Sequence, residues 1–373
     1  MVMRFIVTGG GTGGHIYPAM AIAQGLQERF HEAKILYVGT SKGLEADIVP
    51  KAGLDFAKIK VEGLARPFSY RTAISLLRAV QGGGEALRIV QRFKPHVVIG
   101  TGGYVCGPVV LAAALFGIPT LIHEQNAFPG VTNRILARFA RRVCITFEDA
   151  HQHFPRKTKI TLTGLPVRPE IMAAERLPGL KALGLSPDKL TVVITGGSRG
   201  ARSINRVMTE ILPNFSQQND VQFCHVTGQA GYWETIDTLK KSGISMGNCG
   251  NIKIVPYLYE MHHALAAADI IIGRAGASFL SEVMVRGIPA ILIPFPFATA
   301  NHQEHNARAL ERRGAAKVIL EKDLTAKILE DTLQTFIQNS SMRRQVSESA
   351  KGLGKTHALR DILDIVAGIS KER

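Results

Sequence analysis

A histidine stands directly after a glycine-rich stretch near the start of the chain, in VTGGGTGGHIYPAM (residues 7–20). An apolar run precedes the glycines and a helical pattern follows them, which predicts a strand, a tight loop and a helix. Backbone N–H groups in such a loop, together with the helix N-terminus, attract anions. At the helix start, a neutral His15 could accept a proton from a hydroxyl group. On its own, a histidine here is more often bonded to the local backbone.

The glycines match a dinucleotide-binding pattern, but their surroundings do not. Gly9, Gly11 and Gly14 fit G-x-G-x-x-G, which is a weak signal by itself. Dinucleotide-binding folds place a carboxylate at the end of the next strand. That strand, KILYVG, is followed by Thr40 rather than by an acidic residue, which argues against an NAD-dependent oxidoreductase. No Lys-Ser or Lys-Thr follows the last glycine, so the loop is not a P-loop.

A second set of candidate ligand-binding residues begins near residue 190. KLTVVITGGSRGARSINRVM repeats the order of strand, glycine loop and helix, and Ser198 in this loop could donate to a phosphate. IIIGRAGASFLSEV (270–283) then places small residues at a helix start. One turn further on, the Glu282 carboxylate could bind both hydroxyls of a ribose. Compensation of the helix dipole explains Glu282 equally simply, but the neighbouring phosphate loop favours a nucleotide site.

The polar loop FPFATANHQEHNA (295–307) offers His302 and Gln303 to sugar hydroxyls. Its position after a predicted parallel strand favours binding over an ordinary surface loop. The chain has no D-x-D motif of clustered carboxylates, so we expect no metal and no other cofactor. Helix N-termini, helped by Arg168 or Arg199, would then stabilise a departing diphosphate.

The elements that must position these residues follow a repeated order. Buried-strand patterns such as RFIVTGG, KILYVG, HVVIGTGG and TLIHEQN alternate with helical stretches, and a second series starts near residue 190. This alternation predicts an α/β protein with two Rossmann-like, doubly wound parallel sheets facing each other across a cleft. The proline-rich stretch 163–190 is expected to link them. The predicted domains are residues 1–164, residues 165–350, and a C-terminal helix in 351–373 that could pack back on the first domain.

The composition of the 373-residue chain narrows its partners. Lys and Arg number 45 and Asp and Glu 30, and the resulting charge of +15 indicates an anionic partner. No nucleic-acid-binding motif appears, so nucleic acid is not expected. The four cysteines are scattered without a C-x-x-C pair, which indicates neither zinc nor disulfides and favours a reducing cytosol. The longest apolar stretch is broken by Gly117 and Pro119, so no membrane span is predicted.

Seven motifs occur in a telling order: GGGTGGHIYPAMAIA, GGYVCGPVVLAA, HEQNAFPGVTN, GLPVR, GGSRGARSIN, GASFLSE and NHQEHNA. Together they resemble the MurG family of bacterial GT-B glycosyltransferases. The resemblance implies inverting transfer of N-acetylglucosamine from UDP-N-acetylglucosamine to the 4-hydroxyl of the muramyl sugar of lipid I, an undecaprenyl-pyrophosphoryl-muramyl-pentapeptide, giving lipid II for peptidoglycan. It also implies a peripheral protein on the cytoplasmic face of the inner membrane, with an anionic membrane surface and cell-wall and division proteins as partners.

The resemblance also implies roles for individual positions. His15 would be the catalytic base, or would only orient the acceptor, and Tyr104 and Glu124 would line the acceptor site. The donor would contact a larger set: Thr12, Gly13, Gly14, Asn126, Arg168, Ser198, Leu258, Ala277, Ser278, Phe279, Leu280, Ser281, Glu282 and Gln303. The chain departs from the family at His302, where glutamine is found, and at Ala275, where serine is common.

Residues 65–94 could contact the membrane. Apolar residues alternate there with arginines: Phe68, Ile74, Leu76, Leu77, Val80, Arg66, Arg71, Arg78, Arg88 and Arg92. An apolar patch ringed by arginines suits an anionic interface. A crossover helix packed on the sheet would show the same pattern. The glycines at 82–84 are expected to break or loosen this helix.

Other functions stay open on the sequence alone. A diacylglycerol glycosyltransferase would use the same kind of donor with a different acceptor. A UDP-N-acetylglucosamine 2-epimerase would share the fold and the donor but would need further acid and base groups and no lipid-facing surface. A UDP-sugar-binding protein without activity would tolerate His15→Ala.

Overall fold

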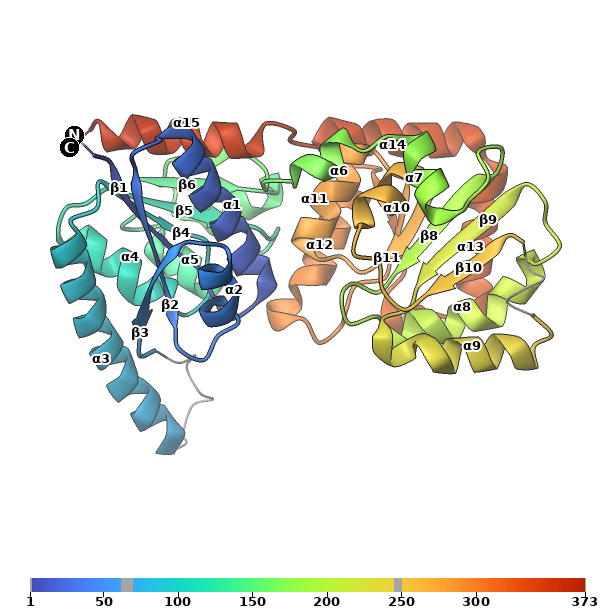
Figure 1. The fold of residues 1–373 in the computed structure, drawn as a ribbon, viewed down its shortest axis with the longest axis horizontal. Helices are drawn as coiled ribbons and strands as arrows, with labels where there is room; N and C mark the ends of the chain where they lie inside the picture. The colour runs from blue at the N-terminus through green and yellow to red at the C-terminus, as the bar shows by residue number, and fades with distance from the viewer. Residues whose placement is uncertain (1, 62–69, 245–249, 373) are drawn as a thin grey trace. The chain divides into compact units, whose positions relative to one another are not determined.

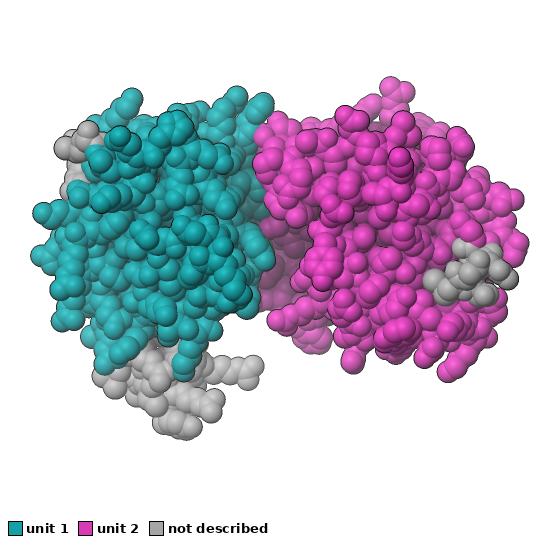
Figure 2. Space-filling view, in the orientation of Figure 1, with its two compact units in different colours: residues 1–166, 357–373 teal, residues 167–356 magenta. Residues whose placement is uncertain are grey.

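The computed structural model describes residues 2–61, 70–244 and 250–372, with side chains for all of these except residues 70–79. The chain forms two compact units: unit 1 comprises residues 1–166 and 357–373, and unit 2 comprises residues 167–356 (Figure 2). The chain therefore passes between the units twice. The boundaries expected after residues 164 and 350 lie within a few residues of these crossings, and the second falls inside a helix, α14 (Ser340–Leu353).

Unit 1 is built on a parallel sheet with the strand order β3-β2-β1-β4-β5-β6-β7 (Figure 1). Its strands are β1 (Arg4–Thr8), β2 (Lys34–Thr40), β3 (Asp55–Ile59), β4 (Val97–Gly100), β5 (Thr120–Glu124), β6 (Arg142–Ile145) and β7 (Ile160–Leu162). Its helices are α1 (Gly13–Arg29), α2 (Glu45–Lys51), α3 (Tyr70–Phe93), α4 (Cys106–Leu115), α5 (Val131–Leu136), η1 (Glu148–His153) and α15 (Ala358–Ser370). The strand order reverses between β1 and β4, and open sheets bind ligands at such a point.

Helices cover both faces of this sheet, which explains why its central strands are continuous apolar runs. Phe5 and Val7 of β1 point to one face and pack with α1 and α15, while Ile6 points to the other and packs with α3 and α4. Helix α15 approaches α1 closely at Gly25, where an added Cβ would lie 3.0 Å from Leu363. The last helix of the chain is therefore part of the core of unit 1.

Helix α3 runs without interruption through the glycines at 82–84, so the expected break was wrong. Ala86 and Val90 are fully buried in the core, and this packing outweighs the roughly 1 kcal/mol by which each glycine disfavours a helix. Gly82 has a packing role, because an added Cβ would lie 2.7 Å from the Lys60 carbonyl oxygen. The apolar side chains expected at 68–77 lie outside the described side chains. Among the described residues, no helix is long and apolar enough to cross a bilayer.

Unit 2 repeats the architecture with the strand order β10-β9-β8-β11-β12-β13. Its strands are β8 (Leu190–Thr195), β9 (Val221–Val226), β10 (Ile252–Val255), β11 (Ile270–Gly273), β12 (Ala290–Leu292) and β13 (Ala316–Val318). Its helices are α6 (Pro169–Ala173), α7 (Arg176–Leu183), α8 (Arg202–Phe215), η2 (Gln229–Gly231), α9 (Tyr232–Lys241), α10 (Met261–Ala267), α11 (Ala277–Arg286), η3 (Thr299–Asn301), α12 (His302–Glu311), η4 (Glu321–Asp323), α13 (Ala326–Gln338) and α14. Here the strand order reverses between β8 and β11.

The stretch 163–190 is not a simple linker. It crosses between the units after Pro166 and then folds into α6 and α7, which pack against α10 of unit 2. Pro169 stands in the first turn of α6, where its missing N–H leaves no helical hydrogen bond unmade. The prolines therefore begin short helices as well as marking the crossing. The prediction of a parallel α/β sheet in each half of the chain is confirmed.

Candidate functional site

Two glycine loops meet at the carboxyl ends of β1 and β4. The Gly10 N–H donates to the Gly102 carbonyl oxygen at 3.3 Å. An added Cβ on Gly103 would lie 2.2 Å from the Gly10 carbonyl oxygen, so only glycine permits this contact. The Tyr104 ring lies over Gly11, 3.3 Å from where its Cβ would be. The loops form one continuous backbone surface that begins at the point where the strand order reverses.

His15 lies at the edge of this surface in the first turn of α1, and its side chain is half-buried. Its Nδ1 is 3.1 Å from the Thr101 carbonyl oxygen and 3.0 Å from Gln125 Oε1. The Thr101 hydroxyl in turn donates to the His15 carbonyl oxygen at 2.8 Å. A Cβ on Gly102 would lie 2.8 Å from Nδ1, so that glycine makes room for the ring. The ends of β4 and β5 thus hold the imidazole from one side.

A buried carboxylate that the sequence analysis missed shapes the first glycine loop. Glu45, the first residue of α2, is fully buried. Its Oε1 accepts hydrogen bonds from the Thr40 N–H at 3.1 Å and the Thr40 hydroxyl at 2.7 Å. Its Oε2 accepts from the Gly11 N–H at 3.3 Å. Because the Gly11 N–H is already bonded to Glu45, an anion at this loop would instead be bound by the N–H groups of Gly13 and Gly14 at the start of α1.

Three glycines leave room for the Glu45 side chain. An added Cβ would lie 2.7 Å from its atoms at Gly10, 2.6 Å at Gly39 and 2.1 Å at Gly43. The sequence analysis looked for a carboxylate at the end of β2 and found none. The carboxylate comes from the following helix and supports the loop from inside the protein. Three glycines around one acidic residue were the signal that could have revealed it.

Glu124, which was expected to line the acceptor site, is engaged within the protein. It is 1% exposed at the end of β5. Its oxygens accept from the Asn126 N–H at 2.9 Å, the Asn126 amide at 3.3 Å, the Gly130 N–H at 3.1 Å and the Asn133 amide at 2.8 Å. A carboxylate saturated in this way fixes the loop after β5. Any effect of Glu124 on a ligand would therefore act through Asn126, which that loop presents.

A thiol lies directly beneath the first site without being reactive. The Cys106 Sγ donates towards the carbonyl oxygens of Thr8 at 3.0 Å and Gly102 at 2.9 Å. Burial raises the pKa of the Cys106 thiol to about 12, so it is neutral at physiological pH. Cys144 and Cys224 are also free and buried, and Cys249 lies outside the described residues. Cys106 therefore contributes packing rather than nucleophilic chemistry.

In unit 2, the corresponding loops follow β8 and β11. Ser198 and Arg199 stand exposed at the tip of the loop after β8. That loop turns at Gly197 and Gly200, where φ is +84° and +74°. An added Cβ on Gly200 would lie 2.1 Å from the Thr227 carbonyl oxygen. Positive φ and this close approach both require glycine. The turn they form places Ser198 at the exposed tip of the loop, where it can contact a ligand.

Helix α11 begins with the residues expected to bind the donor. Gly276 is its N-cap, and the next three residues place their N–H groups in the first turn. Leu280 is fully buried, and its N–H donates to the Gly276 carbonyl oxygen at 2.9 Å. The Ser281 hydroxyl donates to the Ala277 carbonyl oxygen at 3.0 Å. The side chains of Leu280 and Ser281 thus face the interior, whereas the first turn of the helix can bind an anion.

Arg274 fixes the start of this loop and was not predicted. It is mostly buried, and its guanidinium donates to the carbonyl oxygens of Ile293 at 3.1 Å and Pro294 at 3.3 Å. It also pairs with Glu321 and donates to the Ser203 hydroxyl at 3.2 Å. One side chain thereby connects the segments after β11, β12 and β13 with α8. An arginine between a buried strand and a run of small residues was the available signal.

Gln303 lies in the first turn of α12 and bridges two loops. Its Oε1 accepts from the Ala275 N–H at 3.2 Å and the Phe295 N–H at 3.0 Å. Only its amide nitrogen is then left to meet a sugar hydroxyl. His302 Nδ1 lies 2.7 Å from the Thr299 carbonyl oxygen. The sugar contacts expected from these residues stay predictions. For Gln303, the amide nitrogen is the group that would donate a hydrogen bond to the sugar.

The structure brings Arg168 and Glu282 together as an ion pair. Arg168 Nε and Nη2 lie 3.1 Å and 3.0 Å from Glu282 Oε1. The side chains are 49% and 13% exposed respectively. Burial raises the pKa of Glu282, and the nearby Arg168 partly opposes this rise. Both residues were expected to bind a UDP-sugar, but here each is the other's partner.

A cluster of side chains of metal-binding types lies at the start of α10, two residues after Leu258. Glu260, His262 and His263 place their ligand atoms within 4.8 Å of one another. Two imidazoles and a carboxylate suit zinc or a similar ion. The sequence analysis did not predict this cluster. The expectation that the reaction needs no metal therefore stays a prediction.

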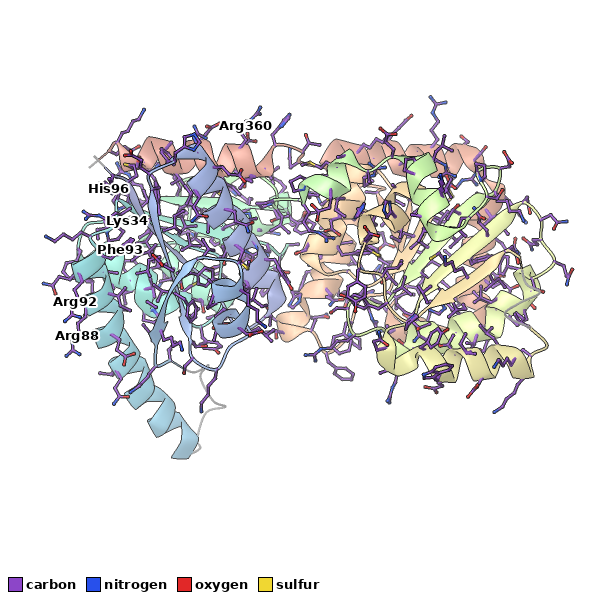
Figure 3. All side chains as sticks on the ribbon, viewed as in Figure 1. Lys34, Arg88, Arg92, Phe93, His96 and Arg360 are labelled. Carbon is purple, nitrogen blue, oxygen red and sulfur yellow. The ribbon has the colours of Figure 1, made fainter. Side chains whose placement is uncertain are left out.

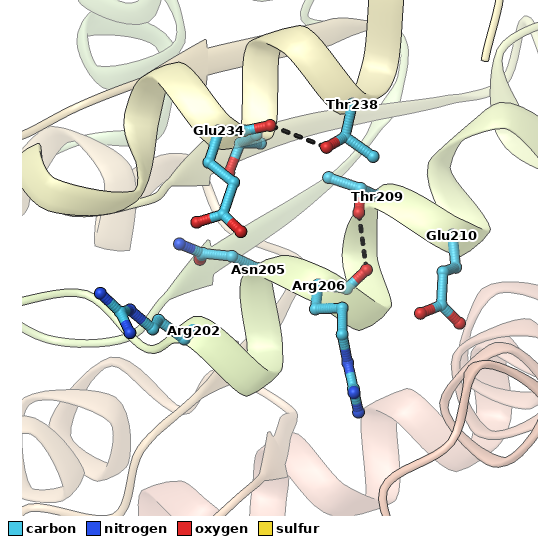
Figure 4. A pocket seen from close by; sticks show the side chains of 8 residues that line it. Arg202, Asn205, Arg206, Thr209, Glu210, Glu234 and Thr238 are labelled. Atoms are coloured by element: carbon cyan, nitrogen blue, oxygen red, sulfur yellow. Dashed lines mark hydrogen bonds between the residues drawn. The ribbon is translucent and has the colours of Figure 1, made fainter. Parts of the chain in front are cut away.

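A separate cavity of about 150 Å³ lies between α8 and α9 (Figure 4). It is lined by Arg202, Asn205, Arg206, Thr209, Glu210, Glu234, Thr235 and Thr238. None of the residues predicted to bind donor or acceptor is among them. The predicted residues gather on the loops at the strand ends instead.

Comparisons with known proteins agree with this arrangement. Residues 5–145 match the family model described as Glycosyltransferase family 28 N-terminal domain, and residues 191–364 match the Glycosyltransferase family 28 C-terminal domain. The chain is 55% identical to a protein of Desulforamulus reducens over 98% of this chain and 99% of the relative. It is 50% identical to one of Moorella thermoacetica over 98% of each. Both are described as UDP-N-acetylglucosamine–N-acetylmuramyl-(pentapeptide) pyrophosphoryl-undecaprenol N-acetylglucosamine transferases.

Solved structures give the same result. The crystal structure of Acinetobacter baumannii MurG is 28% identical, with a TM-score of 0.80 over 98% of this chain and 99% of that chain. A Listeria monocytogenes protein described as a putative UDP-N-acetylglucosamine 2-epimerase, 13% identical with a TM-score of 0.68, shares the fold alone. The family resemblance and the GT-B fold class predicted from the sequence are confirmed. Two family models spanning most of its length, and relatives identical at half of their positions, show that this chain belongs to glycosyltransferase family 28.

Proposed function

We propose that this chain transfers N-acetylglucosamine from UDP-N-acetylglucosamine to the 4-hydroxyl of the muramyl sugar of lipid I, giving lipid II for peptidoglycan. The observation that carries the proposal is the 55% identity, over 98% of the chain, to a relative described by this reaction. The two family 28 domains support a hexosyltransferase. The reaction inverts the anomeric carbon in a single displacement.

His15 is the base of this reaction. The acceptor hydroxyl gives its proton to the imidazole while its oxygen bonds to the anomeric carbon, and the bond from that carbon to UDP breaks on the opposite side. Support comes from the position of His15 at the end of β1 and β4, beside backbone N–H groups that suit the acceptor's diphosphate. Thr12, Gly13 and Gly14 form that part of the site. Asn126 and Tyr104 stand on the neighbouring loops.

Unit 2 binds the UDP moiety by exchanging an ion pair. The first turn of α11 and the loop carrying Ser198 receive the diphosphate. Arg168 leaves Glu282 for the diphosphate, and the Glu282 carboxylate accepts the ribose hydroxyls. An exchange of this kind is inexpensive because Arg168 is 49% exposed and its pairing is screened by water. Because burial has removed water from Glu282, hydrogen bonds from the ribose compensate for solvation that it lacks.

Unit 1 contacts the membrane through α4 and α5, a surface the sequence analysis did not predict. Helices α4 and α5 pack together. Exposed apolar residues gather on them and directly after them: Leu111, Leu115, Phe116, Val131, Ile135 and Phe139. Arg134 and Arg138 lie among these. Apolar residues flanked by arginines bind an anionic bilayer surface.

Helix α3 adds positive charge to unit 1. Arg88 and Arg92 are exposed one turn apart and project from the same side of the helix (Figure 3). The inner half of α3, at Ala86 and Val90, packs on the sheet as a crossover helix does. The protein is therefore peripheral, on the cytoplasmic face of the inner membrane, where UDP-sugars are available. Partners among cell-wall and division proteins belong to this proposal as well.

The test offers radiolabelled UDP-N-acetylglucosamine to the full chain with a lipid I analogue, and with diacylglycerol in a parallel reaction. We expect labelled lipid II and no labelled diacylglycerol. A reaction that consumes UDP-N-acetylglucosamine without any acceptor would indicate an epimerase. Label in diacylglycerol alone would overturn the acceptor assignment. The same assay with a chelator is expected to retain activity, and a loss that only a divalent ion restores would overturn the metal-independent mechanism.

A further inference from the structure

The His15 ring belongs to a chain of hydrogen bonds that begins at a second, buried histidine. His123, on β5, is fully buried, and its Nε2 lies 2.9 Å from the Gly164 carbonyl oxygen. A carbonyl oxygen only accepts hydrogen bonds, so Nε2 carries the hydrogen and Nδ1 carries the lone pair. Burial lowers the pKa of His123 to about 4, so the ring is neutral at physiological pH. The tautomer of His123 is thereby defined.

Gln125 connects the two histidines, and its orientation is determined by its neighbours. It is 2% exposed. Its amide nitrogen lies 2.8 Å from the Thr101 carbonyl oxygen, 3.0 Å from the His123 carbonyl oxygen and 3.1 Å from His123 Nδ1. All three partners accept. Turning the amide over would place its oxygen against three acceptors in a buried space, so Oε1 must face His15.

The tautomer of His15 follows from these contacts. Its Nδ1 faces Gln125 Oε1 at 3.0 Å and the Thr101 carbonyl oxygen at 3.1 Å. Both are acceptors only, so Nδ1 of the neutral ring carries the hydrogen. The lone pair is then on Nε2, away from β4 and β5. A general base needs an unprotonated nitrogen directed at its substrate, and this arrangement supplies one.

We propose that Gln125 is a positioning residue that, together with His123, holds His15 in the Nδ1–H tautomer and keeps its Nε2 ready to accept the acceptor's proton. The catalytic part rests on the proposed function, in which His15 is the base. The tautomer itself depends only on the hydrogen bonds. Among the described residues, Nδ1 contacts an amide oxygen and a backbone carbonyl oxygen, so neutral groups orient the base.

Few titratable groups other than His123 stand on the elements around His15. At the ends of these elements nearest to His15 they include Tyr17 on α1, Tyr37 on β2, Glu45 on α2, Tyr104 in the loop after β4, Cys106 on α4 and Glu124 on β5. Glu45 and Glu124 are buried and accept hydrogen bonds from other groups. Burial keeps the Cys106 thiol and the Tyr37 hydroxyl neutral by raising the pKa of each. Apart from His15, the groups that form the hydrogen-bonded chain are therefore a neutral imidazole, an amide and backbone carbonyl oxygens.

Nitrogen-15 NMR of histidine side chains tests the tautomers directly. The full chain is labelled with ¹⁵N-histidine and measured above pH 7.5, and His15→Asn and His123→Asn identify the two rings. We expect His15 to be protonated on Nδ1 and His123 on Nε2, so the two rings are opposite tautomers. A His15 protonated on Nε2, or an equal mixture, overturns the positioning inference whatever the activity.

Gln125→Leu tests the catalytic consequence. It removes the amide but keeps a similar volume, so we expect kcat to fall roughly tenfold with the KM for the donor unchanged. Gln152→Leu, at an exposed position of the same unit, is the matched control and should leave kcat unchanged. Thermal unfolding verifies that both variants fold. If Gln125→Leu folds and keeps the wild-type kcat, Gln125 does not position the base.

Gln125→Glu tests the orientation of the amide. Its second carboxylate oxygen would face the carbonyl oxygens of Thr101 and His123, which is the same clash that excludes the turned amide. We expect kcat to fall at least as far as in Gln125→Leu, and a folded Gln125→Glu variant with the wild-type kcat would count against the proposal. If His15→Ala keeps normal turnover while the NMR shows the expected tautomers, the role of His15 as base fails but the hydrogen-bonded arrangement stands.

Discussion

The two units have the same architecture but partner their functional side chains differently. In unit 1, His15 is held by neutral groups of β4 and β5 that are nearly or fully buried. In unit 2, Arg168 and Glu282 form an ion pair whose arginine is half-exposed. Buried neutral networks hold one geometry, because any rearrangement leaves a polar group unpaired. A half-exposed ion pair can be exchanged at little cost. In the function proposed here, unit 1 therefore orients a proton acceptor, and unit 2 changes partners when a charged ligand arrives.

The largest expected effect is the loss of turnover on replacing His15 in unit 1. We expect His15→Ala to lower kcat by about 10²- to 10⁴-fold, because removal of a general base has that range of effects. Donor affinity, measured by calorimetry with UDP, should stay nearly unchanged, because the charged residues proposed to bind the donor, Arg168 and Glu282, lie in unit 2. A parallel loss of UDP affinity in this variant would contradict the division of roles.

In unit 2 we expect a substitution to weaken donor binding. Glu282→Ala should weaken UDP-sugar binding roughly 10- to 100-fold, because hydrogen bonds to a charged group contribute about 1.5–3 kcal/mol. Glu170→Ala is a suitable control, since Glu170 also lies near Arg168, at 3.7 Å, but is half-exposed. Calorimetric titration with UDP distinguishes them. If both variants lose the same affinity, the effect comes from Arg168 and not from a ribose contact.

Each unit also has one fully buried histidine, and these predict acid sensitivity. Burial lowers the pKa of His123 to about 4 and of His225 to about 3. The unfolded chain takes up a proton near pH 6.5, whereas the folded protein does not, so stability falls as the pH drops from 6.5 towards these values. At pH 5 the loss is roughly 2 kcal/mol for each ring.

Urea unfolding at pH 7 and pH 5 measures this loss. The two rings differ in their partners: both nitrogens of His123 are bonded, whereas Nδ1 of His225 has no hydrogen-bond partner. His225→Met removes one titrating ring, and the loss between the two pH values should fall by roughly 2 kcal/mol, the contribution of that ring. An unchanged loss would mean that His225 is protonated in the folded protein.

The smallest effect concerns the surface of α4 and α5 in unit 1 that we propose contacts the membrane. Leu115 is 70% exposed on α4, and Leu177 is 66% exposed on α7 of unit 2. Leu115→Ser should weaken binding to anionic phospholipid vesicles roughly tenfold, which is the lower end of the roughly 1.5–3 kcal/mol that full burial of a leucine contributes, because the side chain enters only the interface. Leu177→Ser should have no effect. Equal effects in vesicle co-sedimentation would show that binding is not confined to α4 and α5.

Much of the fold was predictable because central parallel strands are continuous apolar runs. Strands β1, β4, β8 and β11, and the glycine loops after them, follow directly from that pattern. The edge strands β3, with the sequence DFAKI, and β7 could not be predicted in this way. Both are short and partly exposed, so they lack a continuous apolar run. The unbroken helix at 82–84 was missed because tertiary packing outweighed glycine's low helix propensity.

The predicted site was less complete for a physical reason. His15, Arg168 and Glu282 could be identified from their place in motifs. The roles of Glu45, Gln125 and Arg274 arise only when the chain folds, because each bonds to residues far away in sequence. Gln125 shows this most clearly. Its function depends on which way a buried amide is turned, and no sequence pattern records that.

The double crossing between units has a consequence for biosynthesis. Unit 1 takes most of its residues from the start of the chain, but α15 completes its core beside α1. A ribosome makes all of unit 2 before it reaches Ala358. Until α15 is made, the part of the apolar face that α1 does not cover stays exposed in unit 1. During that interval unit 1 is the part of the chain that chaperones would have to shield.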